Sequence, residues 1–361
     1  MKRRTAIALI LCFAMIFTLV ACGKKAEAPA PAQSGSTPAQ SSSSSTPAQP
    51  AAPEKKAVNI KLASFEAADQ SVPSSFEAMC QAIKEASDGR ITITHYPASQ
   101  LGTIQELQEA LRLGTVDMSQ IDPSMFANLQ PEWGVLSLPM LVRDFDHFQK
   151  VATSDLVTGE MTDFTIAESG VRMLGMYYKG FRVFDTTRSI RTFADRKSIK
   201  LRSPEADLYI QTFSRLGMSP TPIAWSEAYT AMQTGVVDGL DTVPDSIMSL
   251  EIYQLGKYIT RANHMVSFNQ IGINEKVWQS LDAEDQALIQ KYIDEYTAAQ
   301  QKEMFEKEDA YYKKFDELGC VVEGFDPAEA DQVKDAFQSY WDEYIKGMSR
   351  GQKILDAILG M

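Results

Sequence analysis

Hydrophobic and polar residues follow one another along the chain in a way that predicts strands and helices in turn. Residues 58–65 and 90–97 alternate with the period of a strand, and residues 74–87 between them show an apolar stripe with helical spacing. A helix over residues 103–114 ends at a glycine, and a short strand follows at 115–122. This order is typical of α/β proteins, so we expect that class with a mostly parallel sheet.

One pattern occurs twice. ALRLGTVDM at residues 110–118 resembles AMQTGVVDG at residues 231–239, and each reads as a helix end, a glycine and a short strand that closes on Asp. Any protein that alternates strands and helices produces this order, so the match could arise by chance. It also fits two lobes of related topology, which is the interpretation that we favour.

The last third of the chain is predicted to be helical. Asp282 is a suitable N-cap, and apolar residues then continue at helical spacing as far as residue 318 without a helix breaker. The apolar positions do not keep a heptad, which argues against a coiled coil. We therefore expect a long helix that crosses between two lobes, followed by one further helix over residues 327–359.

The first residues resemble a bacterial lipoprotein signal. Basic residues at the N-terminus precede an apolar run at residues 5–21. This run is shorter than a membrane span, which needs about 20 residues, and it leads into the sequence LVAC. The resemblance implies a signal peptide over residues 1–21 and a lipid on Cys22. A plain signal peptide or a short anchor are the alternatives. Residues 22–57 are rich in Ala, Pro and Ser, so we expect a disordered tether.

The remaining body, residues 58–361, exceeds the about 250–300 residues at which a single core stops growing, so two domains are expected. The chain of 361 residues has a net charge of −12. Its basic first residues lie outside this body, which is therefore more acidic than the whole chain. Nucleic acid and anionic membrane surfaces are therefore poor partners. Cys80 and Cys320 are expected as two separate buried thiols rather than as a disulfide. Scattered histidines and the lack of CxxC or HExxH spacing predict no metal site.

Two arginines stand where predicted strands end. Arg202 closes the short strand in SIKLRSP, and Arg182 follows an apolar strand at residues 171–178 and a Lys-Gly turn. Trp225 also lies where a strand gives way to a helix. Ligands of α/β sheets bind at such strand ends, and two guanidinium groups there could hold one carboxylate. The alternative is that these arginines form ordinary surface ion pairs.

The stretch from Leu201 to Gly239 resembles the core signature of the solute receptors of TRAP transporters, the DctP family. The resemblance rests on LRSP, on LGMSPTPIAWSEAYTAMQTGVVDG and on SQLGT with EALRLGTVDM, and it extends over nearly all of the body. It implies a two-lobed fold like that of type II periplasmic binding proteins, with a long interlobe helix. We expect lobe 1 over 58–179 plus 268–307 and lobe 2 over 180–267 plus 308–361.

The resemblance also implies a role. A receptor of this family captures a small organic acid between its lobes and delivers it to a separate TRAP permease in the membrane. It would be extracytoplasmic, held at the membrane by the lipid on Cys22, and monomeric. It would use no cofactor and catalyse no reaction.

Matched by position, Arg202 falls on the carboxylate clamp of the family, Arg182 on a second basic position and Trp225 on an aromatic residue of the pocket. Arg202 would then lack a protein anion because the ligand supplies one. Thr242 stands where some members have a pocket Asn, and Glu205 stands where sialic-acid receptors have a neutral residue. The ligand pocket is thus expected to differ from that of a sialic-acid receptor.

Positions that touch ligand in sialic-acid receptors hold Phe65, Ile104, Asp122 and Met125 in this chain. They imply a pocket of apolar walls and carboxylates, which argues against sialic acid. A hydroxylated or amino-bearing acid could use Asp122 and Glu205 as hydrogen-bond acceptors. The alternatives are ordinary core positions for the apolar residues, a turn for Asp122 and the first turn of a helix for Glu205.

Three functional classes follow. The tether, the two expected lobes and the family signature favour a transport receptor. The same cleft would serve a receptor that presents its ligand to a membrane sensor, and the sequence does not separate these two. An enzyme would need a nucleophile with a base, a metal cluster or paired carboxylates, and Asp122 with Glu205 is the one pair that could be considered.

Overall fold

The computed structural model describes residues 55–361. The predicted signal peptide, Cys22 and nearly all of the predicted tether lie outside these residues. The Lys55 ammonium forms an ion pair with Glu284 at 2.7 Å, so the first described residue already contacts the rest of the body. None of the helices in residues 55–361 combines the length and the apolar character that a membrane span requires.

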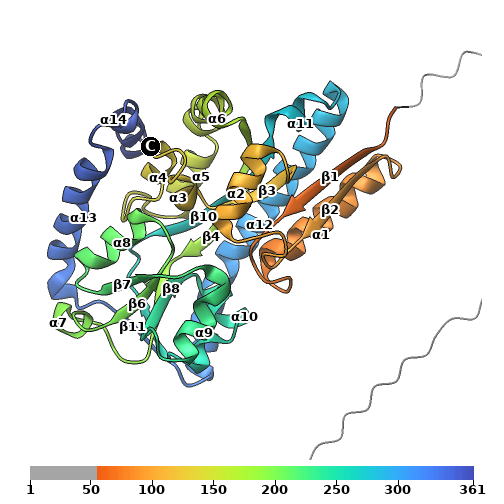
Figure 1. The fold of residues 1–361 in the computed structure, drawn as a ribbon. Helices are drawn as coiled ribbons and strands as arrows, with labels where there is room; N and C mark the ends of the chain where they lie inside the picture. The colour runs from red at the N-terminus through yellow and green to blue at the C-terminus, as the bar shows by residue number, and fades with distance from the viewer. Residues whose placement is uncertain (1–54) are drawn as a thin grey trace, which may run out of the picture. The chain divides into compact units, whose positions relative to one another are not determined.

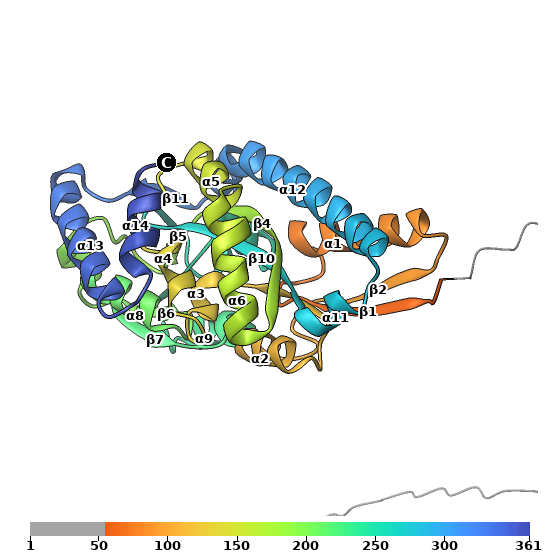
Figure 2. The ribbon, with the colours of Figure 1, turned by 90° about the horizontal axis from the view of Figure 1, so that it is seen from above.

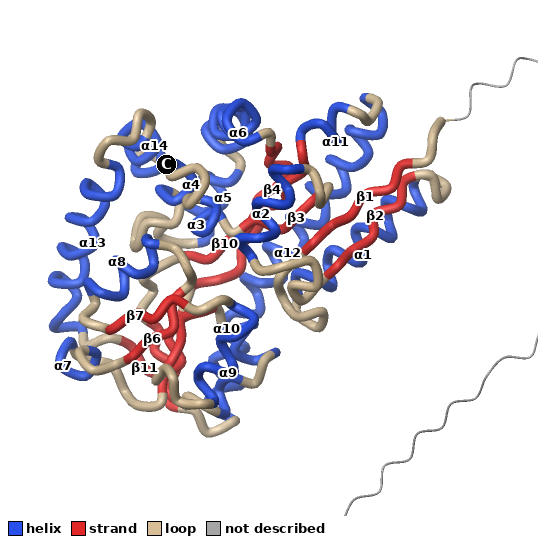
Figure 3. The backbone as a smooth tube through the Cα atoms, viewed as in Figure 1, coloured by secondary structure: helices blue, strands red, loops and turns tan. Residues whose placement is uncertain are grey.

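The described strands form two sheets, which appear as two red groups in Figure 3. The first sheet contains, in order, β2 (Ile91–Tyr96), β1 (Val58–Ala63), β3 (Met118–Ile121), β10 (Val266–Asn274) and β4 (Val171–Phe181). The second contains, in order, β11 (Val321–Gly324), β9 (Tyr258–Arg261), β5 (Val183–Thr186), β8 (Gly239–Thr242), β6 (Lys200–Ser203) and β7 (Ser219–Pro222). The α/β class is confirmed, and in each sheet a single strand runs against the others, which all share one direction. β10 runs antiparallel to β3 and β4, and β5 runs antiparallel to β8 and β9.

Helices surround both sheets (Figure 1). The α-helices are α1 (Ser71–Ala86), α2 (Ile104–Leu113), α3 (Pro123–Phe126), α4 (Glu132–Val135), α5 (Phe145–Ala152), α6 (Thr162–Ser169), α7 (Phe193–Arg196), α8 (Asp207–Arg215), α9 (Ala228–Gln233), α10 (Pro244–Ser249), α11 (Glu275–Gln279), α12 (Ala283–Glu317), α13 (Ala330–Ile345) and α14 (Gly351–Leu359). A π-helix, η1 (Leu156–Met161), precedes α6, and 3₁₀ turns form η2 (Trp225–Glu227), η3 (Ile252–Gln254) and η4 (Pro327–Glu329). The prediction of one helix over residues 327–359 is wrong, because the chain turns between α13 and α14 with Gly347 at φ 85°.

The two sheets repeat one arrangement of strands. The order β2-β1-β3-β10 in the first sheet corresponds to β7-β6-β8-β5 in the second, with three parallel strands followed by one antiparallel strand in each. The similar segments 110–118 and 231–239 are the α2–β3 and α9–β8 connections of these units. Gly114 and Gly235 have φ of 77° and 72°, which is a conformation that glycine adopts without a steric penalty. The sequence similarity therefore reflects a repeated structure.

The Asp that closes each repeated segment has the same function in both sheets. The Asp117 carboxylate accepts a hydrogen bond from the backbone N–H of Lys61 on β1 at 2.8 Å. The Asp238 carboxylate accepts one from the backbone N–H of Lys200 on β6 at 2.9 Å. Each Asp thus ties the start of its own strand to the adjacent strand, which explains why this residue recurs.

Two polypeptide connections and α12 link the sheets. The first connection runs from β4 through Arg182 into β5, and the second runs from β9 into β10. Each of them takes the chain from one sheet to the other, and the two lie side by side. There the backbone N–H of Arg182 donates to the carbonyl of Met265 at 2.9 Å. This hydrogen bond joins the two connections where they cross.

The 35-residue helix α12 packs against both sheets and runs beside α1 and β4 in Figure 2. The Asp282 carboxylate accepts from the backbone N–H of Asp285 at 2.9 Å, which confirms it as the N-cap. Ile289 and Ile293 enter the core of the first sheet, and Tyr312 and Phe315 enter that of the second. The helix is therefore fixed to both halves of the body.

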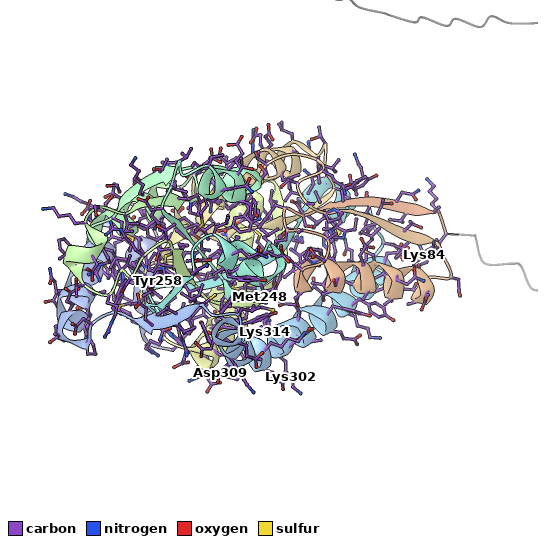
Figure 4. All side chains as sticks on the ribbon, turned by 90° about the horizontal axis from the view of Figure 1, so that it is seen from below. Lys84, Met248, Tyr258, Lys302, Asp309 and Lys314 are labelled. Carbon is purple, nitrogen blue, oxygen red and sulfur yellow. The ribbon has the colours of Figure 1, made fainter. Side chains whose placement is uncertain are left out.

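Charged side chains cover the outer face of α12, where Lys302, Asp309 and Lys314 are labelled in Figure 4. Cys80 and Cys320 are both buried and free, as predicted. They belong to the separate apolar cores of the first and the second sheet, respectively.

Gly239→Ala provides a test of the close approach of β8 to β5. An added Cβ would lie 2.6 Å from the carbonyl oxygen of Asp185 and 2.6 Å from Cγ2 of Thr186. We expect a loss of about 1–3 kcal/mol in the free energy of unfolding, measured by urea denaturation. Gly159→Ala is the control, because no atom lies within 4 Å of its Cβ position, and it should leave stability equal or slightly higher. Equal stability of the two variants would show that β5 can move away.

Candidate functional site

A cavity is lined by both sheets at the carboxyl ends of their parallel strands, and its empty space, open solvent at its mouth included, is about 420 Å³. The lining residues are Phe65, Glu66, Ile104, Asp122, Lys179, Arg182, Arg202, Pro204, Trp225, Thr242, Ser246 and Ser267. A second hollow, with about 290 Å³ of empty space including open solvent, shares Ile104, Arg202, Pro204 and Trp225 with the first and adds Met125 and Glu205. The structure thus brings all the residues predicted to bind ligand to one or other of these hollows.

Arg202 is a buried cation on β6. Its side chain is 3% exposed, and no Asp or Glu in residues 55–361 forms an ion pair with it. Nε donates to the carbonyl oxygen of Ile223 at 2.9 Å, and the guanidinium carbon lies 5.5 Å from the centre of the Trp225 ring. Burial, together with the positive charge of Arg182, lowers the pKa of Arg202 to about 10. An anion in the cavity would compensate this charge.

Arg182, in contrast, is already paired. Its guanidinium forms an ion pair with the carboxylate of Asp241, which also contacts Nε2 of His264 at 2.9 Å. Burial opposes the charge of Arg182, but Asp241 outweighs that effect and raises its pKa above the ordinary value. Burial likewise opposes the charge of Asp241, whose pKa Arg182 and His264 hold below its usual range. Both arginines line the cavity as predicted, but of the two only Arg202 lacks a carboxylate partner among residues 55–361.

Asp122 has the structural role that was considered as its alternative. It is the N-cap of α3 and accepts from the backbone N–H of Ser124 at 2.9 Å. The Ser124 hydroxyl also contacts this carboxylate and lies 2.9 Å from the hydroxyl of Tyr209, which stacks on Arg182. Burial raises the pKa of Asp122. The side chain therefore fixes a turn and contributes to the cavity wall.

Most of the other residues predicted to bind ligand form the wall of the two hollows. Phe65 is 7% exposed and packs with Ile104 and Trp225 in a small apolar cluster. Thr242 ends β8 and is buried, and Met125 belongs to the main core while its surface reaches the second hollow. These apolar residues are therefore core residues, as the alternative interpretation stated, and they also line the hollows.

Glu205 lies at the mouth, where it is half-buried. Its backbone carbonyl accepts hydrogen bonds from Nε2 of Gln105 at 3.1 Å and from Nδ2 of Asn128 at 3.2 Å. Both donors come from the part of the chain that surrounds the first sheet. This contact between the two halves uses the main chain of Glu205 and leaves its carboxylate at the second hollow.

Four polar residues of the first cavity were not predicted from the sequence: Glu66, Lys179, Ser246 and Ser267. Lys179 was assigned to a turn, but it lies within β4, where it is 7% exposed and forms an ion pair with Glu66. Burial lowers the pKa of Lys179 to about 7. A lysine inside the otherwise apolar run MYYKGF was the available signal. Within residues 55–361, no group of three or more His, Cys, Asp or Glu side chains could hold a metal ion.

Residues 62–347 match the family model of bacterial extracellular solute-binding protein, family 7, named DctP. The chain therefore belongs to this family of TRAP solute-binding proteins. It is 28% identical to a sialic acid-binding periplasmic protein, SiaP, of Vibrio cholerae over 80% of this chain and 88% of the relative. It is 26% identical to a 2,3-diketo-L-gulonate-binding periplasmic protein, YiaO, of Escherichia coli over 76% of this chain and 84% of the relative.

Solved structures agree with the fold. A TRAP periplasmic solute-binding protein from Bradyrhizobium in complex with D-galacturonate superposes with a TM-score of 0.77 at 26% identity, over 84% of this chain and 100% of that one. One from Xanthobacter autotrophicus with bound β-D-galacturonate gives a TM-score of 0.78 at 24% identity, over 83% and 99%. The fold is thus the two-lobed α/β fold of the type II periplasmic binding proteins.

Asp241→Asn tests the buried ion pair at the crossing of the strands. The change leaves the guanidinium of Arg182 buried without a counter-charge, which typically costs about 3–5 kcal/mol. We expect a loss of this size in the free energy of unfolding, measured by urea denaturation. Glu109→Gln removes an exposed pair with Arg112 and should cause no measurable change. If both variants unfolded at the same urea concentration as the parent protein, Asp241 would not stabilise Arg182.

Proposed function

We propose that the chain is an extracytoplasmic receptor that captures a small organic acid in this cavity and delivers it to a TRAP permease. The observation that carries the proposal is the guanidinium of Arg202, which is buried beside the cavity and has no carboxylate partner among residues 55–361. Family membership supports the proposal, since the members are solute-binding receptors. Relatives named for binding sialic acid and 2,3-diketo-L-gulonate, both of which carry a carboxylate, support an acid as ligand.

The energetics of such a site are sufficient. Each charge-assisted hydrogen bond contributes roughly 1.5–3 kcal/mol, and the planar guanidinium can donate two to one carboxylate. A micromolar dissociation constant requires about −8 kcal/mol. Packing of the ligand skeleton against Phe65 and Trp225 would supply most of the rest, so one free arginine suffices.

The remaining expectations belong to the same proposal. Residues 58–179 plus 268–307 and residues 180–267 plus 308–361 would act as the two lobes that close over the acid. A lipid on Cys22 would hold the receptor at the membrane, with residues 22–57 as the tether. The observed reach of α12 into both apolar cores supports its role as the connecting helix.

Arg202→Ala tests the proposal. We expect it to abolish the rise in melting temperature that the parent protein shows with its acid, in a screen of mono- and dicarboxylates, sugar acids, keto acids and amino acids. For the parent, a hundredfold excess of ligand over the dissociation constant stabilises by about 2.7 kcal/mol. The ligand-free variant should melt within a few degrees of the parent, because Arg202 forms no ion pair within residues 55–361.

Arg112→Ala is the matched control, since it removes an exposed arginine that is not among the residues lining either hollow and should leave binding unchanged. Retained binding by Arg202→Ala would contradict the proposal. A loss of stability as large as that of a core substitution would show that Arg202 is structural.

A further inference from the structure

Besides Arg202, the cavity contains a buried pair of charged side chains, Glu66 and Lys179, to which the proposed function assigns no role. Glu66 follows β1 and is 2% exposed, and Lys179 lies on β4 and is 7% exposed. The Lys179 ammonium is in ion-pair contact with Oε1 of Glu66. The other oxygen, Oε2, is buried and has no hydrogen-bond partner among the described residues. A buried carboxylate oxygen without a donor is costly, so its position at a cavity indicates that something else supplies the donor.

We infer that Glu66 and Lys179 form a second ligand subsite that binds a hydroxyl group of the acid held at Arg202. The inference rests on the proposed function and narrows its ligand to a hydroxylated monocarboxylate. A hydroxyl donates one hydrogen bond and accepts others, whereas a lysine ammonium only donates and a carboxylate only accepts. One hydroxyl can therefore donate to Oε2 of Glu66 and accept from Nζ of Lys179.

The balance of charge favours a hydroxyl over a charged group. Lys179 is compensated by Glu66 and Arg182 by Asp241, so of these three cations only Arg202 has no contacting carboxylate in the described part of the chain. A second carboxylate on the ligand would meet the negative charge of Glu66, and an ammonium would meet the positive charge of Lys179. Both would be desolvated without a free counter-charge, which disfavours them.

The wall between the two subsites is suited to a short carbon skeleton. The Lys179 ammonium lies 6.0 Å from the centre of the Phe65 ring, and the Arg202 guanidinium lies 5.5 Å from that of Trp225. Both rings pack in one apolar cluster. The carboxylate at Arg202 would thus lie beside Trp225 and the hydroxyl at Lys179 beside Phe65.

Ser246 can assist the hydroxyl subsite. Its Oγ accepts a hydrogen bond from Nε2 of Gln70 at 3.1 Å, so its own proton remains available to a ligand oxygen in the cavity. A site that is built to bind a hydroxyl rejects analogues without one, because its buried polar groups are then left unpaired. Discrimination should therefore be large.

The test compares acids that differ only in the group opposite the carboxylate. Isothermal titration of the full chain would use butyrate, 4-hydroxybutyrate, succinate and 4-aminobutyrate, their six-carbon counterparts, and D-gluconate against D-glucarate. We expect the parent protein to bind the hydroxyl member of a series at least about tenfold more tightly than its methyl, carboxylate and ammonium members. Equal or tighter binding of the methyl or a charged member would overturn the inference.

Two variants should change this preference in opposite directions. Glu66→Gln leaves Lys179 as a second free cation and should shift preference toward the dicarboxylate. Lys179→Met leaves Glu66 as a free anion and should shift preference toward the amino acid. Lys150→Met, an exposed lysine outside the cavity lining, is the matched control and should keep the parental preference.

Each single variant leaves one buried charge unpaired and can prevent folding, so the double variant Glu66→Gln with Lys179→Met keeps the test decisive. It should still bind acids at Arg202 but lose the parental preference for the hydroxyl. A double variant that retained the parental preference would overturn the subsite. If the parent protein bound no acid of any class, the proposed function would fail and the subsite with it. If acids bound through Arg202 but with equal affinity whatever group they carried opposite the carboxylate, the subsite would be contradicted and the proposed function would stand.

Discussion

The requirement that a buried charge must be compensated organises this molecule around its cavity. Asp241 compensates Arg182 where the chain passes between the sheets, and Glu66 compensates Lys179 on the strand that leads to the same place. Arg202 is buried nearby and has no such partner among residues 55–361. Three similar cations thus have different consequences: one stabilises the strand crossing, one forms a neutral polar pair and one remains available to an anion.

The repeated topology determines where these charges lie. Each sheet presents the carboxyl ends of its parallel strands to the cavity, so residues from equivalent places in the two halves face one another. Asp117 and Asp238 show how closely the halves correspond, since each ties its strand to a neighbour through the same kind of bond. The cavity residues differ between the halves, as they must if one side supplies the aromatic ring of Phe65 and the other supplies Arg202.

Sequence patterns predicted the fold class, the long helix and the strand-end position of Arg202, because each depends on local spacing or on an extended family signature. The pairing of Arg182 with Asp241 could not be predicted, since these residues are far apart in the sequence and meet only when β5 pairs with β8. The ion pair of Lys179 with Glu66 was missed for the same reason. Asp122 shows a third case, in which one carboxylate both caps a helix and lines the cavity, so neither interpretation excluded the other.

The hydrogen bonds at Glu205 have an evolutionary consequence. Gln105 and Asn128 hold the carbonyl oxygen of this residue, which every amino acid possesses, and its side chain takes no part in that contact. Position 205 can therefore change from an acid to a neutral or basic residue while the two halves keep the same attachment. Descendants of such a receptor can acquire new ligands by substitution at the mouth of the cavity, without a compensating change in the contact that joins its walls.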